Sequence, residues 1–145
     1  MKFYLVINKE KEPSVTIVTD KVTSVVSKIE ELCKFDEQSD LMYGYSSGEI
    51  CPLTLADVTC FFTKDGKVFA RSGGEEYATK LRIKDVEEMV DDSFIKINQG
   101  CVANVSRIKK FAVTIGAGLK AIFDDGSADY VSRREVSNVK RRFGL

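Results

Sequence analysis

The stretch with the clearest capacity for chemistry runs from Phe94 to Asn104. Two short apolar runs flank a polar break at Asn98-Gln99-Gly100, which fits a tight turn because Asn and Gly tolerate the backbone angles that a turn demands. Asn and Gln are also the side chains that pair bidentately with the edge of an adenine. Composition alone favours a simpler interpretation, in which this break only connects two segments of a β-rich core.

Two later motifs change that balance. The stretch reads Phe-x-Lys-x-Asn-x-x-x-Val-x-Asn over residues 94–104, and it is followed by Ile108-Lys109 and then by Val131-Ser132-Arg133-Arg134. In order and in spacing, these three motifs resemble the LytTR-type DNA-binding domain of bacterial transcription regulators. The resemblance covers roughly residues 42–145.

The resemblance implies a mainly β fold with small helices, in which loops and strand ends enter the major groove without a recognition helix. The positions that match base contacts are Gln99, with Asn98 beside it, and Arg134. Supporting or phosphate contacts are expected from Lys96, Ser132 and Arg133, with Lys67 as a weaker candidate from a hairpin.

Two side chains in these motifs have structural interpretations as well. Asn104 matches the family's asparagine, and we interpret it as satisfying local backbone groups. Arg134 could instead cap a helix or form a salt bridge with Glu135 or Asp129.

This chain departs from the family at the turn. The family usually has a histidine and a basic residue at the first two positions, followed by Ser and an aromatic residue. Here the four residues are Asn98, Gln99, Gly100 and Cys101. The family's base preference therefore does not carry over to this turn, and the smaller Cys101 implies different local packing.

Charge is distributed unevenly along the 145 residues, although the net charge is zero. Residues 1–95 carry 12 Lys+Arg and 18 Asp+Glu, a net of −6, whereas residues 96–145 carry 10 and 4, a net of +6. Such asymmetry is a hint of nucleic-acid contact, since the local field attracts phosphates. A basic C-terminal helix that is merely solvated is the alternative.

Other function classes find little support. The chain has no histidine, so the commonest general base is absent, and it has neither a Walker A motif nor a dinucleotide-binding glycine motif. The four cysteines, Cys33, Cys51, Cys60 and Cys101, are too scattered for a metal site, and we expect reduced thiols. We predict no enzyme activity and no cofactor. Because no apolar run is long enough to span a membrane, we predict a cytoplasmic protein.

The N-terminal segment has its own pattern. Lys2–Asn8 and Ser14–Thr19 are predicted as strands, and apolar residues at helical spacing predict a helix over Lys21–Cys33 with Asp20 as N-cap. The polar run Lys34–Asp40 is the candidate linker. We therefore predict a β-β-α extension over residues 1–38, which serves in dimerisation or partner binding, or packs back on its own domain.

Residues 41–145 predict the DNA-binding domain itself. Short strands are expected at 41–45, 49–53, 58–63, 67–71, 76–81, 94–97, 111–115, 119–123 and 128–131, with helical turns at 53–57 and around 104–108. Residues 83–90 predict a helix with an acidic outer face, and a terminal helix opens at Ser132 or Arg133. In the 58–63 strand, Val58, Cys60 and Phe62 are expected to share one face.

The resulting hypothesis is a sequence-specific DNA-binding transcription regulator. The resemblance also implies direct-repeat operators, a homodimer and, as in some stand-alone members, a membrane-bound antagonist. The alternative is a β-rich protein-interaction module whose basic tail binds an acidic partner.

Overall fold

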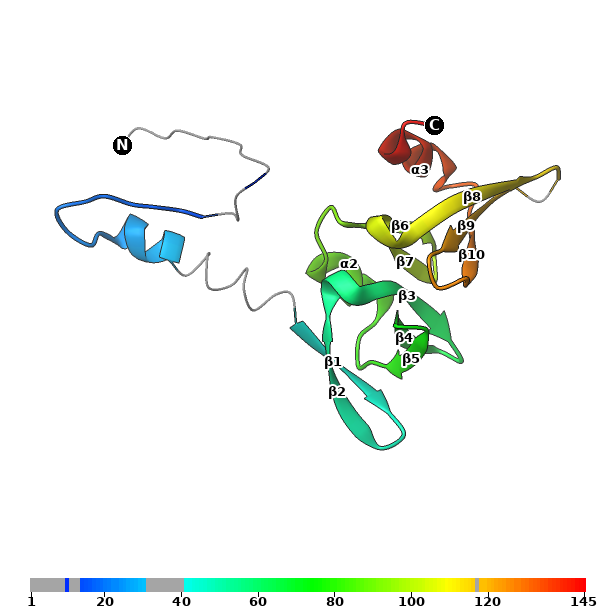
Figure 1. Cartoon of the computed structure of the whole chain (residues 1–145), viewed down its shortest axis with the longest axis horizontal. Helices are drawn as coiled ribbons and strands as arrows, with labels where there is room; N and C mark the ends of the chain where they lie inside the picture. Colours follow the sequence, from blue (N-terminus) through cyan, green and yellow to red (C-terminus); the bar gives the residue numbers. More distant parts are fainter. Residues whose placement is uncertain (1–9, 11–13, 31–40, 117) are drawn as a thin grey trace. The chain divides into compact units, whose positions relative to one another are not determined.

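The computed structural model describes residues 10, 14–30, 41–116 and 118–145 (Figure 1). The chain divides into two units between Glu37 and Gln38. The predicted strand Lys2–Asn8, the linker 34–40 and the end of the predicted helix lie outside the described residues.

In the N-terminal unit, residues 24–30 are helical. The helix begins after Thr23, whose hydroxyl accepts a hydrogen bond of 3.4 Å from the Val26 amide, so the prediction of Asp20 as N-cap was wrong. The predicted strand over residues 14–19 is not observed: the segment has no regular secondary structure, and Val15 is 63% and Val18 95% exposed.

A seven-stranded antiparallel sheet forms most of the second unit, in the order β2-β1-β5-β4-β3-β7-β6. Its strands are β1 (Leu41–Ser46), β2 (Glu49–Thr54), β3 (Val58–Lys64), β4 (Lys67–Ser72), β5 (Glu75–Ala78), β6 (Phe94–Asn98) and β7 (Cys101–Asn104). The 3₁₀ turn η1 (Leu55–Asp57) joins β2 to β3.

One core lies on the face of this sheet that packs against α2 (Ile83–Met89). Its central residues are Phe61, at 0% exposure, and Val86, which α2 contributes. The rings of Phe61 and Phe94 meet with centroids 5.8 Å apart. The helix begins where the Asp85 carboxylate accepts the Arg82 amide at 2.9 Å.

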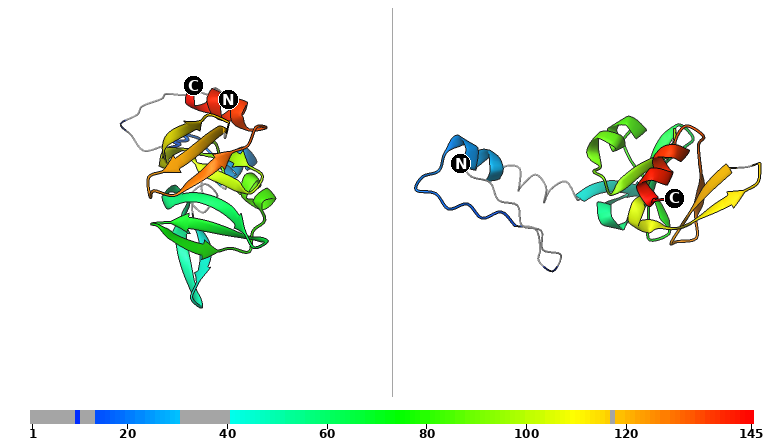
Figure 2. Two further views of the ribbon diagram at one scale, coloured as in Figure 1. Left: turned by 90° about the vertical axis from the view of Figure 1, so that its right-hand side faces the viewer. Right: turned by 90° about the horizontal axis from the view of Figure 1, so that it is seen from above.

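The other core lies beneath a three-stranded sheet of order β10-β9-β8 and the terminal helix α3. These elements are β8 (Ile108–Thr114), β9 (Gly118–Phe123), β10 (Ala128–Val131) and α3 (Val136–Phe143), with the 3₁₀ turn η2 (Val105–Arg107) before β8. Figures 1 and 2 show β8 to β10 and α3 at one end of this unit and the β1–β2 hairpin at the other. The Phe143 ring packs edge-on against Phe111 at 4.9 Å, which holds α3 in place with the buried Val139.

A β-bulge corrects one prediction about β3. Opposite the adjacent pair Ser72 and Arg71 of β4, strand β3 presents Val58 and Cys60, so one extra residue enters the strand. Val58 consequently packs in the α2 core, whereas Cys60 and Phe62 belong to the other. The three residues do not share a face.

Elsewhere the elements follow the sequence closely, although β5 ends at Ala78 and β8 begins at Ile108, each three residues earlier than predicted. Two further differences concern β7 and α3. Residues 101–104, for which the sequence predicts no strand, form the fully buried strand β7 between β3 and β6. The terminal helix begins at Val136, because residues 133–135 form a turn whose Ser132 carbonyl accepts the Glu135 and Val136 amides.

Candidate nucleic-acid interface

The turn between β6 and β7 is held from within by Asn98, which is 3% exposed. Its side-chain oxygen accepts the Gly100 amide at 2.9 Å, and its side-chain nitrogen donates to the Tyr130 carbonyl at 2.9 Å and to Asp129 at 3.2 Å. The Asn98 amide is therefore fully engaged inside the protein, which leaves it nothing to offer a base.

Gln99 lies at the tip of this turn and is exposed. The Gly100 carbonyl, which follows Gln99 in the turn, accepts a hydrogen bond of 2.8 Å from the Thr63 amide. The turn is therefore fastened to β3 as well as to β10. A fixed backbone with a free amide side chain is suited to reading a base edge, because little freedom is lost on binding.

The junction between β10 and α3, residues 132–135, lies beside the Asn98–Gly100 turn. The Ser132 amide donates to the Ile97 carbonyl at 2.9 Å, which fixes the start of the junction against β6. Arg133 and Arg134 follow in the turn and are exposed. Within the described part of the chain, neither guanidinium forms a hydrogen bond or an ion pair, so the alternative of a salt bridge from Arg134 to Glu135 or Asp129 is not observed.

Lys96 lies apart from these residues. Its neighbours Ile95 and Ile97 point into the α3 core, and the lysine itself points to the α2 side, where its ammonium pairs with Glu87 at 3.2 Å. A phosphate contact from Lys96 would require release from that carboxylate.

Lys67 begins β4 directly after the tight turn Asp65-Gly66 and is exposed. The pairing of Phe62 with Cys101 sets the β3–β4 hairpin beside β7. This hairpin tip and the Asn98–Gly100 turn therefore lie at the same end of the sheet.

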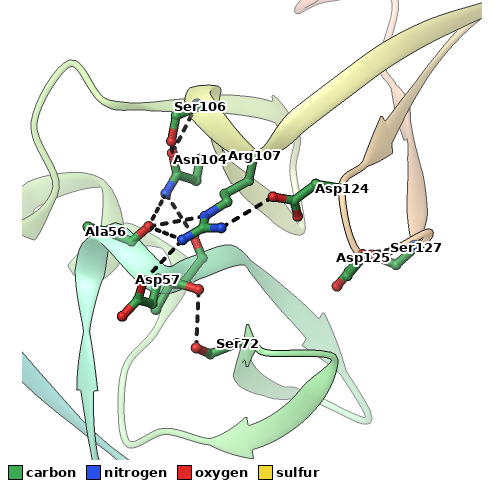
Figure 3. A network of polar contacts seen from close by, with 10 residues as sticks. Ala56, Asp57, Ser72, Asn104, Ser106, Arg107, Asp124, Asp125 and Ser127 are labelled. Carbon is green, nitrogen blue, oxygen red and sulfur yellow. Dashed lines mark hydrogen bonds and ion pairs between the residues drawn. The ribbon is translucent and has the colours of Figure 1, made fainter.

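A polar network fastens η1 to η2 (Figure 3). Asn104, 2% exposed, donates to the Val58 carbonyl at 2.9 Å and accepts the Ser106 amide at 3.1 Å, which confirms its predicted structural role. Arg107 donates to the Ala56 carbonyl at 3.1 Å and pairs with Asp57 and Asp124 at 3.0 and 3.3 Å. This cation belongs to the fold, so the excess of positive charge after residue 95 overstates the charge available to DNA.

The two buried cysteines of the β3–β7 pair behave as packing residues. Cys60 and Cys101 are free and are 1% and 0% exposed. A hydrogen bond with Cys60, together with burial, raises the pKa of the Cys101 thiol well above 9.0, so Cys101 stays protonated. Cys51 is also free, and Cys33 lies outside the described residues.

The comparison with protein families decides the identity of this fold. The model of the LytTr DNA-binding domain matches residues 48–144. The chain belongs to the LytTR family. It is a DNA-binding transcription regulator of LytTR type with a mainly antiparallel β fold, as the three motifs predicted.

Relatives and a solved structure agree with this assignment. An uncharacterised HTH-type transcriptional regulator of Staphylococcus aureus strain MSSA476 is 27% identical over 150 residues, covering 100% of this chain and 99% of the relative. A second one, from strain NCTC 8325, is 26% identical with the same coverage. The LytTr DNA-binding domain of a protein described as a methyl-accepting/DNA response regulator from Bacillus cereus superposes with a TM-score of 0.68 at 20% identity, over 73% of this chain and 98% of that domain.

Among the described residues, no helix has the length and hydrophobicity needed to span a membrane.

Proposed function

We propose that this LytTR protein reads specific duplex sequences in the major groove through two short segments, the turn at Gln99 and the junction at Arg134. The observation that carries the proposal is Asn98, which binds both segments together. It closes the Gly100 turn and donates to Tyr130, two residues before Ser132. Two exposed polar side chains are thereby held in a fixed relation to each other, as simultaneous reading of two base positions requires.

The residues take different roles in this proposal. Gln99 pairs with an adenine edge and Arg134 with a guanine, the partners whose hydrogen-bonding edges match these side chains. Ser132, Arg133 and Lys67 contact phosphates and set the register. Lys96 joins them only if DNA displaces Glu87, and Asn98 acts by positioning.

We further propose that a homodimer occupies two like-oriented half-sites on one face of the duplex, as the LytTR resemblance implies. The N-terminal extension, residues 1–38, supplies the contact between copies. Its described part supports this because apolar side chains stay exposed there, Val18 at 95% and Val22 at 73%. Light scattering on the full chain and on a chain lacking residues 1–38 tests the idea: a monomer in both cases contradicts it.

A membrane-bound antagonist is the other occupant proposed for residues 1–38, and it implies a cytoplasmic protein. The support is the family resemblance together with the same exposed apolar side chains. Retention of the full chain, but not of the shortened chain, on membranes of the source cell is the expected result.

The function as a whole is tested by selection from a random-sequence duplex library with the full chain. Enrichment of a shared sequence, followed by tighter binding to that duplex than to a scrambled one, is the expected outcome. Salt-sensitive binding to every duplex with no enrichment would favour the alternative of an interaction module with a basic tail.

A further inference from the structure

A line of lysines begins at the Gln99 turn, crosses β3 and β4 of the seven-stranded sheet and ends just after β5. Lys64 pairs with Lys67 across β3 and β4. The pairing of β4 with β5 sets Phe69 opposite Ala78, and the hydrogen bond of 2.9 Å from the Thr79 amide to the Val68 carbonyl continues it by one residue. Extended by one more residue, this register brings Lys80, in the bend after β5, next to Lys67.

The other end of this line reaches the proposed base reader. Phe62 pairs with Cys101, and the hydrogen bond of 2.8 Å from the Thr63 amide to the Gly100 carbonyl continues that register. One residue further along β3, Lys64 comes level with Gln99. Lys64, Lys67 and Lys80, which we name the basic row, thus form a line from the turn across β3 and β4 to the bend that follows β5.

The basic row lies on one face of the sheet and is open to solvent. The ammonium of Lys64 lies 5.9 Å from the centre of the Phe69 ring, and that of Lys80 lies 5.2 Å from the centre of the Tyr45 ring. Lys67 points to the same side because it is two residues before Phe69 in β4. All three lysines are exposed.

Nearby carboxylates do not cancel this charge. Glu76 pairs with Lys64 at 3.3 Å, but it also pairs with Arg71 at 3.1 Å, so it keeps a partner if Lys64 turns to another anion. Asp65 lies in the hairpin turn between Lys64 and Lys67, which leaves the row with a net positive charge.

We propose that the basic row binds successive phosphates of the duplex whose bases Gln99 reads, which adds Lys64 and Lys80 to the interface. The proposal rests on the function proposed above. Adjacent strands are about 4.8 Å apart, so the row spans about 10 Å, enough for the flexible lysines to meet more than one phosphate of one DNA strand. The row therefore adds affinity that is independent of sequence, while Gln99 and Arg134 select the sequence.

The test uses the full chain with Lys64→Gln and Lys80→Gln, singly and together, and Lys84→Gln as the matched control. Lys84 is also exposed but lies on α2. Each variant is titrated, at 50 and 200 mM salt, with a duplex that the wild-type chain selected from a random library and with its scrambled counterpart. Thermal unfolding confirms that each variant is folded.

Each of the two substitutions, Lys64→Gln and Lys80→Gln, is expected to lower the affinity for both duplexes by the same factor. It should lower the slope of log K against log salt by about 0.9, so the deficit relative to wild type shrinks about 3.5-fold between 50 and 200 mM salt. Lys84→Gln should leave affinity and slope close to the wild-type values.

Two results would overturn the basic row. In the first, Lys64→Gln and Lys80→Gln have the same affinities and the same salt slopes as the Lys84→Gln control. The other is a loss confined to the selected duplex, which is the mark of a base contact. In both cases the wild-type preference for its selected duplex persists, whereas failure of the proposed function itself would abolish that preference in the wild-type chain.

Discussion

The side-chain nitrogen of Asn98 donates a hydrogen bond of 2.9 Å to the main-chain carbonyl of Tyr130, 32 residues further along the chain. Through this bond the turn that presents Gln99 and the junction that presents Arg134 become one rigid unit. Asn98 has a side chain suited to pairing with adenine, but it is buried and acts by fixing the positions of its neighbours.

Replacing Asn98 should disturb both stability and discrimination. Asn98→Ala leaves the Gly100 amide and the Tyr130 carbonyl without their partner, which we expect to cost about 1–3 kcal/mol of unfolding free energy. Asn98→Asp keeps the acceptor for Gly100 but sets a carboxylate against Asp129, so it should also lower the ratio of specific to random binding. Urea denaturation and duplex titration measure the two effects. Wild-type discrimination in a folded Asn98→Asp chain would contradict the positioning role.

Replacing Asn104 should also lower stability, although this residue has no proposed part in DNA recognition. Asn104→Ala removes the partner of the buried Val58 carbonyl and of the Ser106 amide, so the free energy of unfolding should fall by about 1–3 kcal/mol. Asn138→Ala, on the exposed side of α3, is the control and should change it by less than about 0.5 kcal/mol. Equal urea midpoints for the two variants would show that the Asn104 hydrogen bonds contribute little.

Glu76 gives a prediction about pH. Its hydrogen bond from Arg71, helped by Lys64, holds the pKa of the Glu76 carboxyl below its ordinary value of 4.5. The stabilisation is therefore fully present above about pH 4.5 and is lost as pH falls through the lower folded-state pKa. Because the carboxylate is exposed, Glu76→Gln should cost less than about 1 kcal/mol at pH 7.

Thermal unfolding of wild type and Glu76→Gln at pH 7 and pH 3 measures this difference, with Glu88→Gln as an exposed control. The gap between wild type and Glu76→Gln should narrow at pH 3. A gap that widens on acidification would mean that the sign of the Glu76 shift is wrong.

The sequence predicts the strands well and the contacts between them poorly. Alternation and turn residues located β3 and the Asp65-Gly66 hairpin, because both signals are local. The bulge that places Val58 in the α2 core, apart from Cys60 and Phe62, arises from pairing with β4, which no local pattern encodes. The Asn98 anchor depends on Asp129 and Tyr130, and nothing in the turn itself indicates a partner 31 residues away.

The candidate site divides in the same way. Gln99 and Arg134 could be chosen because motif positions carry over residue by residue, and exposure agrees with them. Lys96 also carries over from its motif position as a phosphate contact, and only the structure reveals its pairing with Glu87. Lys80 lies outside every motif, so the sheet register was needed to find it.

Operator geometry provides a prediction at the level of the complex. Two like-oriented half-sites bound by a dimer should be spaced near a whole number of helical turns of about 10–10.5 base pairs. Inserting about five base pairs between them moves one half-site to the far side of the duplex, so occupancy of the pair should weaken. Footprinting on the original, half-turn and full-turn spacings measures this. Unchanged occupancy at the half-turn spacing would count against side-by-side docking.

In the proposed function Arg134 reads a base, whereas the cations of α3 contact only the phosphate backbone of the DNA. A bidentate arginine–guanine pair provides roughly 1–3 kcal/mol of discrimination, so Arg134→Ala should bring specific binding closer to random binding. Arg141, exposed in the last turn of α3, is the matched control. Arg141→Ala should weaken binding to both duplexes by the same factor and flatten the salt dependence of binding. If Arg141 touches no phosphate, the substitution should leave binding unchanged.

The decisive measurement is the ratio of specific to scrambled duplex affinity for wild type, Arg134→Ala and Arg141→Ala at two salt concentrations. We predict a ratio that falls about 5- to 150-fold in Arg134→Ala, as 1–3 kcal/mol implies, and stays at the wild-type value in Arg141→Ala. An unchanged ratio in a folded Arg134→Ala chain would show that Arg134 does not read a base and would contradict the proposed function.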